Sequence, residues 1–255
     1  MATINTNVGA QVALQSLNKT NASLEVTQNR ISTGLKVSSA KDNGAVFAVA
    51  SGLRAESGAL DAVKGSLGRG QAILDVGLAA AENVLASLEE LKALSVNIAG
   101  STGAANTAYQ ADFTAIKANI DKAIANATFD GVAILSTAAT TVISDTTASG
   151  RLTIGAGALT VTLTSTSTIG AVTTAINAFG ASVARLGTQH AALTRQLTFI
   201  GKLQDATDAG IGNLVDADLA KESARFTALQ TKQQLGAQAL SIANQAPSIL
   251  LSLFR

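Results

Sequence analysis

The densest group of ionisable side chains in this sequence is a set of aspartates toward the C-terminal end. Neighbouring carboxylates can work as a general acid and base, or can supply oxygen ligands to calcium. The order of residues does not match a calcium-binding loop, and aspartates are also common at helix ends, where they cap free backbone N–H groups. We therefore interpret the set as a solvated helix face with a helix cap. Its members are Asp205, Asp208, Asp216 and Asp218.

No other pattern indicates catalysis. The chain has one histidine and no cysteine, so it has no cluster of transition-metal ligands and no thiol nucleophile. The HExxH, P-loop and GxSxG patterns are also missing. His190 falls in an apolar heptad pattern, where it could sense pH or could reach solvent from the edge of the pattern. The sequence predicts neither an enzyme nor a bound cofactor or metal.

The composition favours long, closely packed helices. Apolar residues make up 47% of the 255 residues, aromatic residues only 3%, and there is a single proline. Charged residues make up 14% and the formal net charge is +1, without a basic patch, so we expect no nucleic-acid partner. We also expect no membrane insertion, because no uninterrupted apolar run reaches about 18 residues. The first ten residues do not resemble a secretory signal peptide.

The C-terminal segment has the spacing of a coiled-coil seam, with apolar residues at steps of four and three. Few charges lie between them, and residues 249–254 are almost wholly apolar, which indicates a surface that is buried in an assembly. A core helix of an ordinary bundle would have the same period. The seam residues are Leu235, Ala239, Ile242, Ala246, Ile249 and Leu253.

The N-terminal segment has the same spacing over several heptads. Two members of its seam are polar, and polar seam residues reduce stability but fix the register and the number of partners. The alternative is an amphipathic helix with a loose seam. The predicted seam runs through Leu14, Leu17, Asn21, Leu24, Gln28, Ile31 and Leu35.

Between these ends the pattern changes twice. Residues 60–98 carry two adjacent apolar stripes, typical of a helix that packs on more than one neighbour, and residues 113–127 predict an antiparallel second helix. Asp130-Gly131 predicts a hairpin turn, after which residues 152–154 and 159–164 alternate as half-buried strands do. Residues 169–179 are consistent with a short helix, and the helical pattern returns from Val183. The stretch 46–54 fits either a strand or a helix.

These patterns predict a mainly α fold, in which a long antiparallel helical rod carries terminal coiled-coil helices and a small β-rich tip. We assign residues 1–44 with 216–255 to an inner coiled-coil domain. Residues 45–130 with 180–215 form the rod, and residues 131–179 form the β-rich outer region. Pro247 is expected to kink or loosen the last turns of the C-terminal helix.

Four motifs resemble those of bacterial flagellins. Residues 29–42, NRISTGLKVSSAKD, resemble the N-terminal signature of that family, and residues 129–135, FDGVAIL, are similar to its FNGxxLL hairpin. Residues 216–222, DADLAKE, and residues 243–247, ANQAP, resemble its C-terminal motifs. They occur in the family's order at both ends of the chain, while the middle is short for the family.

The resemblance implies a structural subunit of the extracellular flagellar filament, exported unfolded by the flagellar type III apparatus. The implied partners are further copies of the chain, alone or together with other flagellins, an export chaperone, the filament cap and the hook-junction proteins. Two alternatives stay open at this point. A hook–filament junction protein shares the terminal helices, and a soluble coiled-coil interaction module would keep its helices folded in a discrete oligomer.

One departure from the family pattern concerns an immune-recognition patch. Many flagellins carry a basic LQRVREL motif that an innate immune receptor recognises, and the corresponding residues here are 88–94, LEELKAL. Glu90 stands where the motif has arginine, and a reversed charge at a recognition contact is costly. We therefore expect weak or absent recognition. The positions concerned are Glu89, Glu90, Lys92 and Leu94.

Overall fold

The computed structural model describes residues 6–135, 139–157 and 159–252, with the backbone alone for residues 246–252. The chain divides into two compact units, residues 1–55 with 207–255 and residues 56–206. Five helices account for most of the described chain, which confirms the mainly α fold. The helices are α1 (Val8–Thr33), α2 (Gly44–Gly100), α3 (Gly103–Asn126), α4 (Ile169–Val215) and α5 (Leu219–Ser252).

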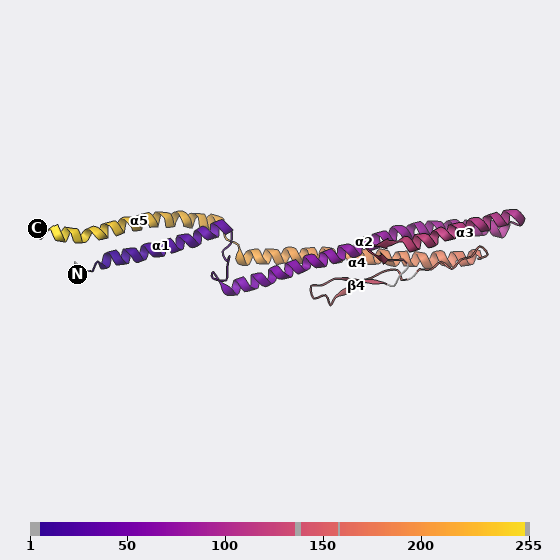
Figure 1. Ribbon diagram of the computed structural model, residues 1–255, viewed down its shortest axis with the longest axis horizontal. Helices are drawn as coiled ribbons and strands as arrows, with labels where there is room; N and C mark the ends of the chain where they lie inside the picture. Colours follow the sequence, from indigo (N-terminus) through magenta and orange to yellow (C-terminus); the bar gives the residue numbers. More distant parts are fainter. Residues whose placement is uncertain (1–5, 136–138, 158, 253–255) are drawn as a thin grey trace. The chain divides into compact units, whose positions relative to one another are not determined.

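In the first unit, α1 and α5 lie side by side and antiparallel (Figure 1). The side chain of Asn7 caps the start of α1 by accepting from Ala10 N at 3.0 Å. The helix ends at Gly34, whose φ of 72° is the left-handed conformation that favours glycine at this position. α5 starts after Asp218, whose carboxylate accepts from Lys221 N at 3.1 Å. This contact confirms the predicted aspartate cap.

The connection between α1 and α2 packs on a small core of its own. Val37 is buried with Ala50 of α2 and Val215 of α4, and Lys36 N donates to Val215 O at 2.6 Å. The carboxylate of Asp42 accepts from the backbone N–H groups of Ser38 and Ser39 at 3.0 and 2.9 Å, and from their hydroxyl groups at 3.1 and 3.2 Å. One charged oxygen therefore fixes the turn that leads into α2.

Leu35 does not belong to the helical seam predicted for it. The glycine cap ends α1 before this residue, and Leu35 instead forms an isolated bridge with Asp216 and packs beside Val37. The predicted connection at residues 38–44 is confirmed, and residues 46–54, which the sequence left ambiguous, are helical.

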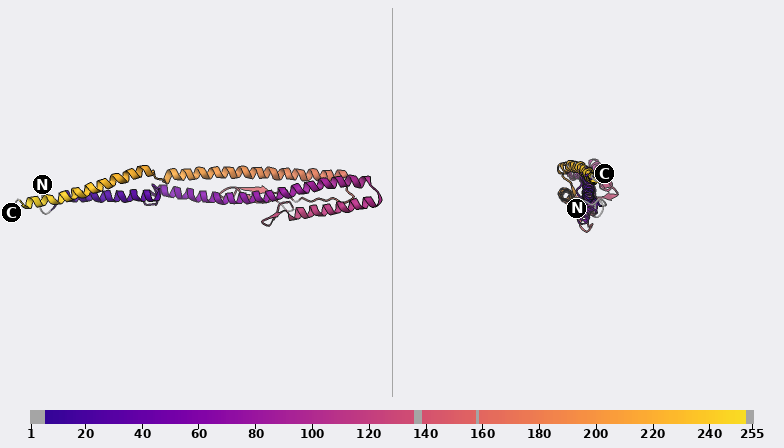
Figure 2. Two further views of the ribbon diagram at one scale, coloured as in Figure 1. Left: turned by 90° about the horizontal axis from the view of Figure 1, so that it is seen from above. Right: turned by 90° about the vertical axis from the view of Figure 1, so that its left-hand side faces the viewer.

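The second unit is built from the 56–100 part of α2, from α3, and from the 169–206 part of α4, which run alongside one another (Figure 2). α3 is antiparallel to α2 after a loop of two residues, Ser101 and Thr102. Phe113 and Ile120 of α3 pack against the two apolar stripes of α2. The core also contains Leu67, Leu74, Leu88, Leu91, Leu186, Leu193 and Ile200.

Two short antiparallel pairs make up the β structure. β1 (Thr128–Phe129) pairs with β2 (Val132–Ala133) across Asp130 and Gly131, whose φ values are 50° and 75°. Positive φ at both turn residues is the geometry that the Asp-Gly pair predicts, so the hairpin is confirmed. β3 (Thr140–Ile143) pairs with β4 (Arg151–Ile154) in register, with Val142 opposite Leu152.

The turn between β3 and β4 is closed by its own side chains. Ser144 N donates to Gly150 O at 3.0 Å, which keeps the two ends of the turn together. The carboxylate of Asp145 accepts from Gly150 N at 2.7 Å and from the hydroxyl groups of Thr147 and Ser149 at 3.1 and 3.0 Å. Residues 146–149 between these ends are exposed.

The β-rich segment packs along the helices of the second unit (Figures 1 and 2). Ser66 of α2 accepts from Ile143 N at 3.0 Å. The side-chain amide of Gln189, on α4, both accepts from Gly155 N and donates to Gly155 O, at 2.9 and 3.2 Å. Polar helix side chains thus take the backbone groups of the β segment that would otherwise lack partners.

Two glycines of α2 provide room for this packing. A Cβ atom at Gly70 would lie 2.6 Å from Cγ1 of Val142, and a Cβ atom at Gly77 would overlap Ile134. These glycines are one heptad apart, so both lie on the same face of α2. Their missing side chains allow the β segment to contact the helix backbone closely.

Two details of the predicted β region are wrong. Residues 159–164 belong to no strand in the described part of the chain, although their burial alternates, with Val161 and Leu163 buried. Residues 169–179 are not a separate short helix, because α4 begins at Ile169 and continues without a break.

By length and composition, α2 and α4 each contain a stretch that is apolar enough to cross a membrane. A helix of a soluble core passes the same test. In the structure, apolar residues of both helices face one another in the core of the second unit, where Leu74 and Leu193 are fully buried.

Candidate assembly interface

The contact between α1 and α5 follows a heptad pattern on both helices. Residues at these positions are half-buried or buried: Ala13, Leu17, Thr20, Leu24, Thr27 and Ile31 on α1, and Glu222, Phe226, Leu229, Gln233, Gly236, Leu240 and Ala243 on α5. We call these residues the inner seam. Its members are spaced by four and three, as in antiparallel coiled-coil pairs. At Gly236 a Cβ atom would lie 3.3 Å from Cδ1 of Leu17, so the two helices approach closely there.

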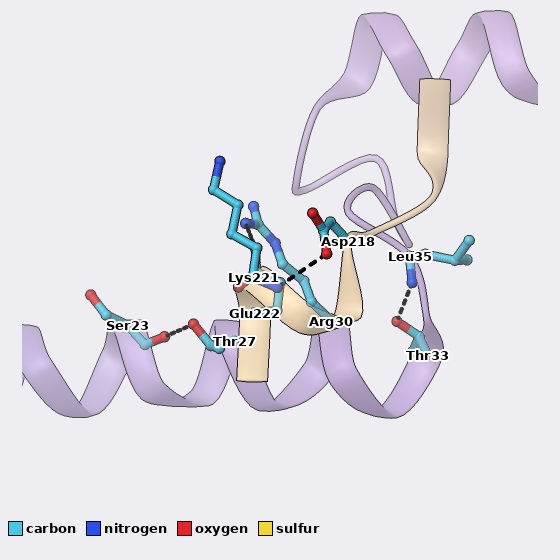
Figure 3. Close-up of polar contacts among 8 residues, drawn as sticks. All are labelled: Ser23, Thr27, Arg30, Thr33, Leu35, Asp218, Lys221 and Glu222. Carbon is cyan, nitrogen blue, oxygen red and sulfur yellow. Dashed lines mark hydrogen bonds and ion pairs between the residues drawn. The ribbon is translucent and has the colours of Figure 1, made fainter. Parts of the chain in front are cut away.

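Polar contacts fix the register of this pair at three levels. Arg30 Nη1 lies 3.0 Å from Oε1 of Glu222 (Figure 3). Gln233 Nε2 donates to Asn21 Oδ1 at 2.9 Å. Near the start of α1, Asn7 Nδ2 donates to Ala243 O at 2.7 Å. Asn21, for which the sequence predicts a role in register, thus contacts α5 of the same chain, and its role in register stays a prediction.

The Arg30–Glu222 ion pair is shielded from solvent. Only 27% of the Arg30 side chain and 11% of the Glu222 side chain are exposed. Among the described residues, Arg30 Nε and Glu222 Oε2 are buried polar atoms without a hydrogen-bond partner. Sequence reasoning missed this pair. A signal was present, because Glu222 is the sole acidic residue of α5, so its charge calls for a specific partner.

The structure separates the predicted seam residues into two groups. Leu17, Leu24 and Ile31 belong to the inner seam and are half-buried. Leu14, Asn21, Gln28, Leu235, Ala239 and Ile242 are exposed. The side chains of Ala246 and Ile249, and all of Leu253, lie outside the described residues, and so does the side chain of Pro247, where α5 continues to Ser252.

The exposed group includes large aliphatic side chains. Leu14 is 48% exposed, Leu235 is 60% exposed and Ile242 is 69% exposed. Val8 and Val12 of α1 are also more than half exposed. In α5 the inner-seam residues Leu229, Gly236 and Ala243 repeat every seven residues. The residues predicted for the seam, Leu235 and Ile242, have the same period and directly precede Gly236 and Ala243 in the sequence. Each terminal helix therefore carries one apolar set that its partner helix covers and another that is left exposed.

The remaining candidate residues form no reactive site. No group of three or more potential metal ligands occurs among the described residues. Nε2 of His190 lies 3.1 Å from Oδ1 of Asp75 and 3.2 Å from Nε2 of Gln71, so this histidine joins α4 to α2. On α2, Glu89, Glu90 and Lys92 are exposed, while Leu94 is half-buried toward the core.

Comparisons with known proteins match both parts of this arrangement. Residues 4–140 match the bacterial flagellin N-terminal helical region, and residues 169–254 match the bacterial flagellin C-terminal helical region. This chain belongs to the bacterial flagellin family. The two matched regions contain all five helices, including the α1–α5 pair.

Relatives resemble this flagellin over its whole length. Flagellin FljK of Caulobacter vibrioides is 47% identical over 99% of this chain and 98% of its own, and a flagellin of Brucella melitensis is 36% identical over the full length of both. A crystal structure of Bacillus cereus flagellin covers 55% of this chain and 86% of its own, with a TM-score of 0.40 and 20% identity.

The family establishes the general role. The chain is a structural subunit of the extracellular bacterial flagellar filament, which serves motility, and it is not an enzyme. The junction protein and the soluble coiled-coil module, which the sequence left open, are not supported.

Proposed function

We propose that this flagellin polymerises through the exposed side of its terminal helix pair. The observation that carries the proposal is the exposure of Leu14, Leu235 and Ile242, which lie at the seam spacing but are not covered by the partner helix. Burying one such side chain contributes about 1.5–3 kcal/mol, so neighbouring copies that cover several of them gain considerable free energy.

The same proposal accounts for an open polymer. The inner seam is used within one chain, and the exposed set is available to other chains. Contact between two different surfaces of identical subunits is heterologous, and such contacts form helical filaments when the rotation does not close.

We assign the domains accordingly. Residues 1–44 with 216–255 form the inner domain of the filament, residues 45–130 with 180–215 form the next layer, and residues 131–179 form the outer region. The first assignment is supported by the division of the chain into two units, although the first unit extends beyond it to residues 1–55 and 207–255. The third is supported by the exposed turn at residues 146–149.

Export and capping follow from the family role. We propose that the subunit leaves the cell unfolded through the flagellar type III apparatus with the help of an export chaperone, and meets the hook-junction and cap proteins outside. The absence of cysteine is compatible with this route, because no disulfide has to form after export.

The variant Ile242→Asp tests the proposed surface. Ile242 is 69% exposed in the single chain, so aspartate should be tolerated by the monomer. In a polymer contact the same charge would be buried without a partner, at a cost of about 3–5 kcal/mol. We expect helicity close to that of the unmodified protein, measured by circular dichroism, and no filaments in sedimentation and electron microscopy.

The control is Ile242→Leu, which keeps an aliphatic side chain at the same position and should polymerise. Normal filaments from Ile242→Asp would remove this residue from the interface and contradict the proposal.

The charge of residues 89–92 leads to a second expectation. Glu89, Glu90 and Lys92 are exposed on α2, so a receptor that reads this stretch would meet two acidic side chains. We expect a receptor reporter assay to show weak or no activation by this flagellin. Glu90→Arg should raise the response, and a potency equal to that of a flagellin with the basic motif would refute the expectation.

A further inference from the structure

We propose that each subunit inserts Glu25 of α1 into a groove between α1 and α5 of a second copy of this chain, where its carboxylate pairs with Lys19 and Lys232. This inference rests on the polymerisation proposed above and identifies one of its contacts.

The groove is formed on one side of the helix pair. It has a volume of about 520 Å³ and is lined by both lysines, by Ser16, Thr20 and Ser23, and by Leu235 and Gly236. The hydroxyl of Thr20 already donates to Ser16 O at 2.9 Å, so the two ammonium groups are the main donors that could receive a carboxylate there. The groove also includes Leu235, one of the exposed residues assigned to polymerisation.

Only one acidic side chain of α1 and α5 is available to enter the groove. α1 contains a single acidic residue, Glu25, and α5 contains a single acidic residue, Glu222. Glu222 is engaged by Arg30 and is nearly buried. Glu25 is exposed and forms no ion pair among the described residues, and the same is true of Lys19 and Lys232. One anion outside any ion pair, Glu25, thus remains on the two helices beside four such cations, and of these only Lys19 and Lys232 line the groove, whereas Lys221 and Arg225 lie outside it.

Within one chain, helix geometry separates Glu25 from Lys19, and Glu25 lies outside the groove that both lysines line. Lys19 and Glu25 are six residues apart, which places their side chains about 120° apart around an α-helix. Lys19 lines the groove, whereas Glu25 does not. The anion of one subunit can therefore reach the cations of another, and because the two surfaces differ, the contact is heterologous and can repeat without closing.

Charge reversal in the full-length protein provides the test. The measured quantity is the critical concentration for elongation of filament seeds made from the same variant. We expect Glu25→Lys to raise it about tenfold, because the contact then brings three cations together, and Lys19→Glu with Lys232→Glu to raise it by a similar factor. Combining all three substitutions restores the charge pairing and should bring the value to within about threefold of the original.

A matched combination controls for net charge. Glu25→Lys with Lys221→Glu and Arg225→Glu has the same net charge as the rescued variant, but its new carboxylates lie on α5 outside the groove. We expect no rescue from it. Circular dichroism of the monomers verifies folding, and Glu25→Gln should cause a smaller rise in the same direction.

Two results would overturn the inference. One is elongation of Glu25→Lys at the original critical concentration. The other is a triple variant that stays as defective as its parents, which would mean that the groove is filled by another anion or by none.

The Ile242→Asp variant separates failure of this contact from failure of the proposed function. If Ile242→Asp polymerises normally, the proposed polymerisation surface itself is wrong. If Ile242→Asp fails and the triple variant is not rescued, the Glu25 contact alone is wrong.

Discussion

Asp42 shows how a single carboxylate can hold the turn between two helices. Its hydrogen bonds with the backbone N–H of Ser39, the hydroxyl of Ser38 and the backbone N–H of Ser38 keep the pKa of its carboxyl group below the ordinary value. A lowered pKa means that the folded chain favours the ionised form more than the unfolded chain does. The stabilisation is therefore complete above the unfolded pKa of about 4 and is lost as the pH falls through the lower folded pKa.

The variant Asp42→Asn tests this linkage. The amide keeps one acceptor oxygen but loses the charge that strengthens the four contacts, so we expect a lower melting temperature at pH 7. The difference between the variant and the original protein should shrink as the pH falls below about 4, because the original carboxyl group then becomes neutral as well. Thermal unfolding, followed by circular dichroism between pH 7 and a pH below about 4, measures this difference in melting temperature. A difference that does not depend on pH would contradict the ionic explanation.

Single residues also mark the limits of the sequence-based prediction at the interface. Leu17, Leu24 and Ile31 were placed on the covered side of α1, and Asp218 was placed at a helix cap, both from spacing and residue type. Arg30 and Glu222 could not be paired in this way, because an ion pair between distant segments depends on the register of two helices. Periodicity identifies a stripe but not which of two neighbouring stripes meets the partner helix.

At the scale of the elements, the helices and the Asp-Gly hairpin were predictable, and the path of the β segment was not. Helical periods and the glycine turn are local signals. Residues 159–164 alternate between apolar and polar side chains because Val161 and Leu163 enter the core. Such an alternation does not specify which strand, if any, the segment pairs with. β3 and the pairing of Gln189 with Gly155 depend on contacts between segments far apart in the sequence.

The contact between α2 and the β segment leads to a prediction about Gly77. A Cβ atom there would overlap Ile134, so Gly77→Ala should destabilise the protein by about 1–3 kcal/mol even though alanine favours helices. Gly65→Ala on the same helix is the control, because nothing lies within 4 Å of its added Cβ atom. It should be neutral, or stabilising by up to about 1 kcal/mol. Urea unfolding measures both, and equal effects at the two positions would contradict the packing argument.

At the scale of the whole molecule, apolar residues are divided between two uses. The second unit packs many of its large aliphatic residues in one core, although Val96 is 51% and Leu203 is 38% exposed. The α1–α5 pair leaves Leu14, Leu235 and Ile242 between 48% and 69% exposed. Under the proposed polymerisation, the core stabilises the subunit, and neighbouring copies cover the exposed residues of the terminal helices.

Trimming the chain tests this division. A version that lacks residues 1–35 and 235–255 keeps every residue of the large core. We expect it to retain a cooperative thermal transition and to form no filaments under salting-out conditions, and we expect the full-length protein to polymerise under the same conditions. Sedimentation with electron microscopy provides the measurement. Long filaments from the trimmed chain would place the assembly contacts elsewhere.

The closed turn between β3 and β4 has a practical consequence. Its ends, Ser144 and Gly150, are joined by a hydrogen bond of 3.0 Å, and the exposed residues between them take no part in the core. Foreign sequence whose own termini lie close together can replace such a loop tip without pulling the strands apart. Every subunit would then carry one copy of the insert, so a polymer of this chain would become a regular multivalent display of a chosen epitope or enzyme.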